Sequence, residues 1–257
     1  MGTKLIGLGH FVPENKITNT YFTDVLGLET SEEWIKDRTG IETRYFTDPN
    51  TSSADIGSLA AKNCIKNASI QAKDIDLILV ATSTPDHIAF PSTACIIQEK
   101  LGCHNTPAFD ISAACSGFSF ALSTGHAFIN SNMYKTILVI GVDCLSKITN
   151  MNDRTTCILF ADAAGAAILQ KSDTNYLLYS KMYSDGSLGD ILSVPKGGSK
   201  DPITNEIIEQ SQHTIQMNGR AVFKIAIQKI IPAIEKGLNA INLSTKNIDY
   251  LICHQAN

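Results

Sequence analysis

The sequence KDIDLIL at residues 73–79 recurs as KNIDYLI at residues 246–252, and 246 minus 73 gives an offset of 173 residues. The helix-like residues before each copy match at the same offset without a gap. A combination of helix and strand that repeats at one fixed offset indicates duplicated halves. We therefore expect a first half over residues 1–173 and the start of a second half over residues 174–257.

Each half is predicted to be a layered α/β structure. The segments LILVAT (77–82) and TILVIGVD (136–143) are continuous apolar runs, a pattern typical of strands whose two faces are both buried. Segments of helical periodicity lie between these runs, which predicts helices on the faces of a sheet. The N-terminal run (1–14) is short and interrupted by glycines, so it indicates a first strand rather than a signal peptide.

The second half is predicted to be truncated. Moving Cys115 by the offset of 173 gives a counterpart at position 288, which is beyond the 257 residues of the sequence. The second half would stop after its first histidine-bearing strand, before the helix that should pack against the Cys115 helix. An incomplete layered core exposes apolar surface, which is unfavourable for an isolated chain.

Cys115 is the predicted nucleophile. It lies in DISAACSGFSFAL (110–122), where a strand-like segment passes through small residues into an apolar helix. The first N–H groups of a helix lack intrahelical partners and the helix dipole is positive there, so the pKa of the Cys115 thiol is expected to fall. A buried structural cysteine is the ordinary alternative.

His254 is the predicted partner of Cys115. It lies in the C-terminal sequence DYLICHQAN (249–257), where we expect a short apolar strand with the histidine at its tip. A cysteine and a histidine from separate strand ends can form a catalytic pair. A core histidine satisfied by backbone groups is the alternative for this residue.

Composition limits the classes of protein to consider. The chain is 44% hydrophobic and 18% charged, which predicts a soluble globular protein, and its net charge of −4 gives no support for nucleic-acid binding. Seven cysteines without a CxxC pair favour a reducing cytoplasm over a disulfide scaffold or a zinc site. No stretch approaches a membrane span. The other histidines lack metal-ligand spacing, and GLGHFV (7–12) lacks the third glycine of a dinucleotide fingerprint, so we expect no metal and no permanently bound cofactor.

Four separated motifs resemble one family. They are AACSGF around Cys115, HQAN at 254–257, SEEWIKDRTGIETR at 31–44 and DRTTCILFADAAGAAIL at 153–169. Together they resemble β-ketoacyl-[acyl carrier protein] synthase III, a condensing enzyme, and the resemblance runs along the whole chain. It implies an α/β thiolase-like fold of two duplicated layered halves, the second of them truncated.

The resemblance implies an acyltransferase that initiates fatty-acid synthesis. Cys115 would take the acyl group of an acyl-CoA primer, and the acyl-enzyme would undergo decarboxylative Claisen condensation with malonyl-acyl carrier protein. Neutral His254 would stabilise the oxyanion together with an asparagine from a later loop, which these 257 residues do not contain. The alternatives are a related acyltransferase of a polyketide or quinolone pathway, and an inactive or partner-dependent truncated subunit.

The resemblance also implies contacts with substrates and partners. Trp34 and Arg154 are expected to sandwich the adenine of CoA, and Arg38 is expected to meet phosphate. Asn257 is expected to reach the pantetheine amides. Phe90 is expected to cross the interface of a homodimer and line the acyl pocket. Contacts with acyl carrier protein are expected at Gln255, Ala256 and Arg220.

Overall fold

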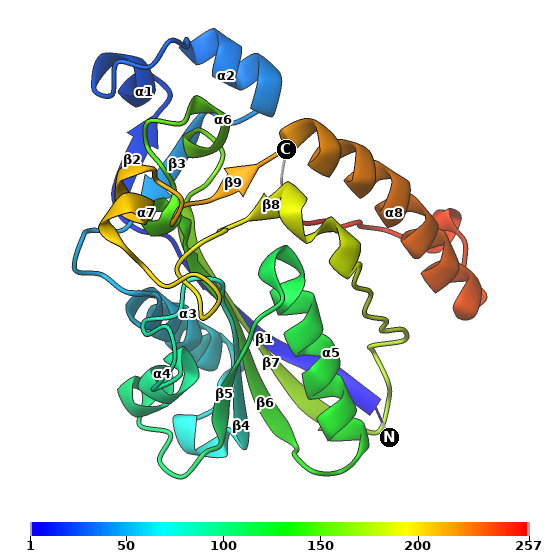
Figure 1. The fold of residues 1–257 in the computed structure, drawn as a ribbon. Helices are drawn as coiled ribbons and strands as arrows, with labels where there is room; N and C mark the ends of the chain where they lie inside the picture. Colours follow the sequence, from blue (N-terminus) through cyan, green and yellow to red (C-terminus); the bar gives the residue numbers. More distant parts are fainter. Residues whose placement is uncertain (1, 256–257) are drawn as a thin grey trace. The chain divides into compact units, whose positions relative to one another are not determined.

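The computed structural model describes residues 2–255, which form two compact units (Figure 1). The first unit comprises the described residues up to Lys16 together with Tyr45–Leu145 and Ala161–Met182. The second comprises Ile17–Arg44, Ser146–Phe160 and the described residues from Tyr183 onward. Each unit combines segments that are distant in the sequence, and the boundary between duplicated halves at residues 173 and 174 stays a prediction.

The first unit contains a five-stranded sheet with the strand order β1-β7-β6-β4-β5. Strands β4 (Leu77–Ala81), β5 (Ala108–Ile111) and β6 (Thr136–Cys144) are parallel to one another. Strand β7 (Asp162–Ser172) runs antiparallel both to β6 and to β1 (Gly2–Phe11). The two strands predicted from apolar runs, at 77–82 and 136–143, and the first strand predicted in residues 1–14 are therefore confirmed. All residues of β4 are buried, as its continuous apolar sequence predicts.

Helices cover both faces of this sheet. Helices α3 (Ser53–Ala68) and α4 (Thr93–Leu101) lie on one face, and α5 (Gly117–Asn130) lies on the other (Figure 1). Successive residues of a strand point to opposite faces. Ile78 of β4 accordingly joins the core under α3 and α4, whereas Leu79 joins the core under α5. The first unit is thus a layered α/β structure, as predicted.

The second unit is built from shorter elements and one long helix. Helix α8 (Gly219–Ala240) has 22 residues, and no helix among residues 2–255 is long and apolar enough to cross a membrane. Strands β8 and β9 form an antiparallel pair, and the separate small sheet of β2 and β3 contains residues assigned to both units. The bounds of the short elements are β2 (Asn15–Thr18), α1 (Thr20–Asp24), α2 (Glu32–Thr39), β3 (Thr43–Phe46), α6 (Arg154–Cys157), β8 (Leu192–Ser193), α7 (Asn205–Glu209) and β9 (Gln216–Met217).

The sequence repeat is also present in the backbone. Helix α3 is followed by Ser69 and helix α8 by Asn242, both left-handed with φ of 55°, and 242 minus 69 is again 173. A short 3-10 turn comes next in each case. The side chain of Asp74 accepts a 2.9 Å hydrogen bond from the backbone N–H of Gln71, and the side chain of Asn247 accepts one of the same length from the N–H of Ser244. The matched conformations show that the offset relates structurally equivalent positions.

The strand predicted before His254 is absent, and this prediction is wrong for the structure. Residues 250–255 have no regular secondary structure and are exposed. Their counterpart β4 lies between β5 and β6 and is hydrogen-bonded to both. A strand needs such neighbours to satisfy its backbone groups. The described part of the second half provides no counterparts of β5 and β6, so its apolar sequence remains irregular.

Candidate active site

Cys115 lies at the edge of the sheet where the parallel strands end. It follows β5 by four residues and belongs to a 3-10 turn, Ala114–Ser116, which leads directly into α5. Cys115 is exposed there. In open α/β sheets, ligands bind beyond the carboxyl ends of the strands. This placement, predicted from the sequence 110–122, puts the thiol where a substrate can reach it.

The turn that presents Cys115 is strained. Ala114 has φ of 44°, in the left-handed region that residues with a side chain rarely adopt. The next helix is held close to the sheet, because a Cβ on Gly117 would lie 3.0 Å from the Cβ of Ala81 in β4. The side chain of Ser116 does not cap α5, and the N–H of Gly117, the first residue of the helix, donates to the carbonyl of Ala114.

The pKa of the Cys115 thiol is raised, so the predicted fall is wrong. Burial has the largest effect, because the surrounding protein desolvates the sulfur even though the residue reaches the surface. The negative charge of Asp143 raises the pKa further, and a backbone hydrogen bond lowers it. Desolvation and a nearby carboxylate therefore outweigh the stabilisation of the thiolate by the backbone.

Asp143 is a residue that the sequence reasoning missed. It lies near the end of β6, where its Oδ1 accepts hydrogen bonds from the backbone N–H of Ser83 (2.6 Å) and the hydroxyl of Thr82 (3.4 Å). Burial raises the pKa of this carboxyl, against the lowering effect of its donors. The available signal was a charged residue at the end of the apolar run 136–143, where burial of the strand makes an acid costly.

Trp34 and Arg154, the two residues expected to sandwich adenine, lie in contact with each other within the second unit. The guanidinium carbon of Arg154 lies 4.7 Å from the centroid of the Trp34 ring. Arg154 also donates a hydrogen bond to the carbonyl of Glu29. Helix α2 begins after Ser31, whose hydroxyl accepts from the N–H of Trp34, and the indole is 38% exposed. The pair is a cation–π contact that remains open to solvent.

Arg38 lies one helical turn beyond Trp34 and faces the same ring. Its guanidinium carbon is 6.0 Å from the indole centroid, at the outer limit of a cation–π contact. The side chains of Trp34, Arg38 and Arg154 therefore form one exposed aromatic surface flanked by two guanidinium groups. Such a surface suits a planar ligand that also carries phosphate.

The structure shows no contact of the other predicted site residues with Cys115, Trp34 or Arg154 among the described residues. His254 and Gln255 belong to the second unit, where they are exposed and irregular, and Arg220 is exposed in the first turn of α8. Ala256 and Asn257 lie outside the described residues. Phe90, in the loop between β4 and α4, is 85% exposed.

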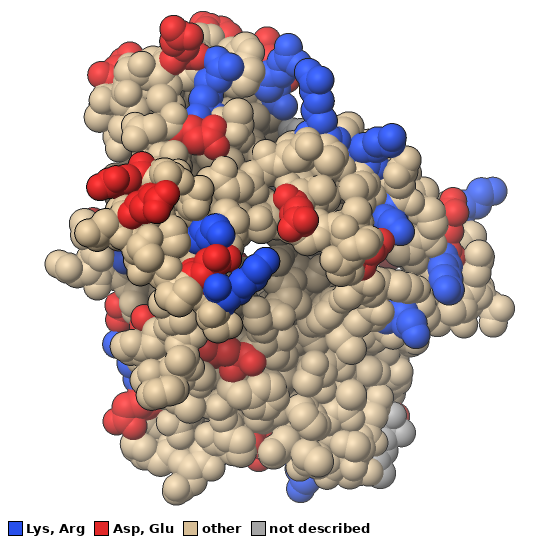
Figure 2. Space-filling model, viewed as in Figure 1, with Lys and Arg blue, Asp and Glu red and all other residues tan. Residues whose placement is uncertain are grey.

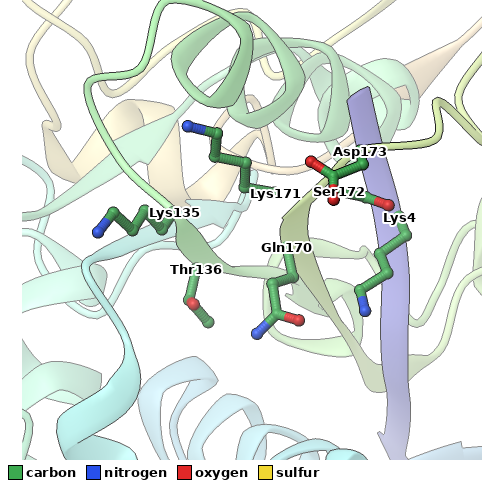
Figure 3. A pocket seen from close by; sticks show the side chains of 7 residues that line it. All are labelled: Lys4, Lys135, Thr136, Gln170, Lys171, Ser172 and Asp173. Atoms are coloured by element: carbon green, nitrogen blue, oxygen red, sulfur yellow. The ribbon is translucent and has the colours of Figure 1, made fainter. Parts of the chain in front are cut away.

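A hollow of about 490 Å³ lies at the other end of the sheet from Asp143. None of the predicted site residues lines it. Figure 3 shows that its three lysines point in different directions, so they do not converge on one anion. One of them, Lys171, donates a hydrogen bond to Asn132 at 2.8 Å. The lining residues are Lys4, Lys135, Thr136, Gln170, Lys171, Ser172 and Asp173.

Charges of both signs are spread over the face of the molecule drawn in Figure 2. Lysine and arginine side chains and aspartate and glutamate side chains are both visible among uncharged residues, and the described residues in this view form no continuous patch of one sign. Proteins that bind the nucleic-acid backbone concentrate positive charge on one surface. The visible face does not have that distribution.

Comparisons with known proteins show which family the chain resembles. The family model for 3-oxoacyl-[acyl-carrier-protein (ACP)] synthase III matches residues 109–186, which include Cys115. A β-ketoacyl-[acyl-carrier-protein] synthase III of Clostridioides difficile (strain 630) is 43% identical over 259 residues, covering 100% of this chain and 78% of that protein.

Solved structures show the same similarity. The synthase III of Aquifex aeolicus VF5 is 37% identical with a TM-score of 0.89, over 100% of this chain and 77% of that one. The priming β-ketosynthase of the R1128 polyketide pathway is 27% identical with a TM-score of 0.89, over 100% of this chain and 75% of that one. The chain therefore has the α/β thiolase-like fold and belongs to the β-ketoacyl-[acyl-carrier-protein] synthase III family of condensing enzymes.

Proposed function

We propose that the chain is an acyltransferase that initiates fatty-acid synthesis from an acyl-CoA primer. The observation that carries the proposal is the position of Cys115, exposed at the carboxyl edge of the sheet and directly before α5. Membership of a condensing-enzyme family at 43% identity supports a covalent role for this thiol. No permanently bound cofactor is required, because acyl-CoA enters as a substrate.

In the first step, the Cys115 thiolate attacks the thioester carbonyl of acyl-CoA. A bond forms between Sγ and the acyl carbon, the bond from that carbon to the CoA sulfur breaks, and CoA leaves as a thiolate that takes up a proton. The positive end of the α5 dipole favours the negative charge that develops. Because burial and Asp143 raise the pKa of Cys115, little thiolate is present at neutral pH.

In the second step, malonyl-acyl carrier protein loses carbon dioxide and forms an enolate. The enolate carbon bonds to the acyl carbon, and the bond from that carbon to Sγ of Cys115 breaks, which releases a β-ketoacyl product on the carrier protein. His254 is the proposed hydrogen-bond donor to the thioester oxygen. The proposed contacts with the carrier protein are made by Gln255, Ala256 and Arg220.

CoA is proposed to bind on the surface formed by Trp34, Arg38 and Arg154. Adenine would lie between Trp34 and Arg154, which requires Arg154 to leave its position 4.7 Å from the indole centroid. Arg38 would contact phosphate, and Asn257 would contact the pantetheine amides. The one-turn spacing of Trp34 and Arg38 on α2 supports recognition of a ring and an anionic group together.

The loop between β4 and α4 is proposed to lie at a homodimer interface. Ile88 and Phe90 in this loop are 88% and 85% exposed. Two large apolar side chains that are almost fully exposed indicate a surface that a partner covers. Phe90 would then contribute to the acyl pocket of the other copy. The cytoplasmic location of the protein stays a prediction.

Two other functions are retained as alternatives. The likeness to a priming β-ketosynthase of a polyketide pathway favours a specialised acyltransferase that also uses Cys115. The chain spans 78% of the Clostridioides difficile relative, and the asparagine expected in a later loop is not among these residues. A partner-dependent or inactive subunit is the other alternative named in the sequence analysis.

The direct test is the intact mass of the protein after exposure to a panel of acyl-CoAs. The proposal predicts the addition of one acyl group, and peptide mapping should locate it on Cys115. Cys95 is a matched control, because it is also an exposed free cysteine but lies in α4. Cys115→Ala should abolish the adduct, whereas Cys95→Ala should leave it unchanged. An adduct that survives Cys115→Ala would contradict the proposal.

A further inference from the structure

Arg44 is a buried cation that the proposed chemistry does not use. It belongs to β3 and is 4% exposed. One terminal nitrogen of its guanidinium donates to Oδ1 of Asn19 at 2.8 Å, and the other donates to the carbonyl of Ile158 at 2.9 Å. The guanidinium carbon lies 4.7 Å from the centroid of the Phe22 ring. The positive charge is therefore held by two neutral oxygen atoms and an aromatic face.

This arrangement is costly for a residue that only fills space. Desolvation opposes the charge, and no carboxylate among residues 2–255 forms an ion pair with Arg44. Its buried Nε also has no hydrogen-bond partner in the described part of the chain. An apolar side chain of similar volume would avoid both costs. The guanidinium is better explained by its planar fork, which holds two acceptors in fixed directions.

Ile158 connects Arg44 to the surface that is proposed to bind CoA. It directly follows α6, a helix of four residues that begins with Arg154. At the start of this helix, Oδ1 of Asp153 accepts from the backbone N–H of Thr155 at 2.9 Å. The single turn is thus capped at its start and tied to the protein interior by Arg44 at its end. Because α6 is so short, the bond at its end also determines where Arg154 lies.

Asn19 connects Arg44 to the other side of the same surface. It is fully buried and directly precedes α1, which leads on to α2 and Trp34. The connection between these two helices contains Glu29, whose carbonyl accepts from Arg154. Within the second unit, α1, α2 and α6 lie together (Figure 1). Arg44 and Arg154 therefore join the same two segments, the first in the interior and the second at the surface.

We propose that Arg44 is a positioning residue, which places Arg154 over the ring of Trp34 and so prepares the surface that binds CoA. The inference rests on the proposed function for the role of that surface, whereas the contact of Arg154 with Trp34 is part of the structure. Because Arg44 is buried, it acts through the backbone of α6 and not by touching the ligand. Its replacement should release Arg154 from the ring.

The first measurement compares the fluorescence of Trp34 in Arg44→Lys and Arg154→Ala. Lysine keeps the positive charge but lacks the planar fork, so a change in emission reports on position and not on loss of charge. Arg154→Ala gives the emission of the ring without its partner. Arg44→Lys should shift the emission in the same direction, and combining the two substitutions should add no further shift. Unchanged emission in folded Arg44→Lys would overturn the inference.

The second measurement is the affinity for CoA by titration calorimetry. Arg44→Lys should weaken binding about threefold or more, because a misplaced guanidinium stacks poorly on a planar ring. In the Arg44→Lys background, Arg154→Ala should cost less than about twofold, because the two substitutions disrupt the same contact. Independent losses that multiply would show a merely structural role for Arg44 and would also overturn the inference.

Two further variants separate position from stability. Asn19→Ala removes one acceptor of the Arg44 fork and should give a smaller emission shift in the same direction. Asp185→Ala is the matched control in the second unit, since its partners Ser187 and Lys229 lie outside α1, α2 and α6, and it should leave the emission unchanged. All proteins are compared below the melting temperature of the least stable one.

Failure of the proposed function gives a different result from failure of this inference. If the unmodified protein did not bind CoA, the proposed role of the surface would be wrong. The emission of Trp34 in the absence of CoA would still show whether Arg44 positions Arg154.

Discussion

Arg154 lies over the ring of Trp34, with 4.7 Å between the guanidinium carbon and the indole centroid, although 120 residues separate the two in the sequence. Trp34 is the only tryptophan of the chain, so all tryptophan fluorescence comes from the ring that Arg154 contacts. A ligand that enters between the two side chains must break the contact. CoA binding can therefore be followed directly at the residue pair that is proposed to bind it.

Replacement of Trp34 by alanine should weaken the binding of CoA about five- to tenfold, because a cation–π contact contributes on the order of 1 kcal/mol. Titration calorimetry with CoA measures the effect. Arg154→Ala should weaken binding to a similar extent and should also change the emission of Trp34 before CoA is added. Equal affinity in all three proteins would place the adenine elsewhere.

Asp143→Asn should make Cys115 more reactive near neutral pH. The carboxylate raises the pKa of the thiol, so its neutralisation lowers that pKa and increases the fraction of thiolate below it. The rate of alkylation by iodoacetamide, measured against pH at Cys115, should reach its half-maximum at a lower pH than in the unmodified protein. Cys95 serves as an internal control whose profile should not move. An unchanged profile at Cys115 would show that Asp143 does not affect the reactivity of this thiol.

Ala114→Gly should stabilise the protein and slow acylation. Relief of the left-handed conformation at φ of 44° is worth about 1–2 kcal/mol, and the greater entropy of glycine in the unfolded chain offsets about 0.5–1 kcal/mol of it. The denaturation midpoint in urea should therefore rise. The rate of acylation by acyl-CoA should fall, because the turn that directs Cys115 becomes less fixed. A lower midpoint would show that the strain is absent in solution.

Arg44→Ala should destabilise the second unit by about 3 kcal/mol, because hydrogen bonds to a charged group are lost and a buried acceptor is left unpaired. The Arg44 guanidinium donates to Oδ1 of Asn19 at 2.8 Å and to the carbonyl of Ile158 at 2.9 Å. Burial lowers its pKa to about 10. Chemical denaturation monitored by Trp34 fluorescence tests this prediction. Lys36→Ala, which removes an exposed ion pair with Glu42, should have no measurable effect.

The strands of the first unit could be predicted because their own residues determine them. The run at 77–82 is apolar throughout, and burial on both faces requires that composition. The segment 249–254 has a similar sequence but forms no strand, because strand formation depends on neighbours that a sequence pattern does not show. A run of apolar residues thus predicts a buried strand only when the remainder of its sheet is present.

The site was predicted in part. The position of Cys115 at the start of a helix followed from the sequence 110–122, whereas the expected adenine sandwich of Trp34 and Arg154 stays a prediction. The direction in which the pKa of Cys115 shifts could not be predicted from the sequence, because desolvation depends on how much protein surrounds the sulfur after folding. Asp143 was missed for the same reason, since its approach to this edge of the sheet depends on the pairing of β6 with β4.

The short distance at Gly117 limits which substrates the site can accept. With the Cβ of Ala81 only 3.0 Å from where a side chain at Gly117 would begin, the start of α5 cannot shift toward β4. Under the proposed function, an acyl chain on Cys115 would meet a fixed boundary on that side. Engineering for longer primers should then begin with loops elsewhere around Cys115 and leave the contact between α5 and β4 unchanged.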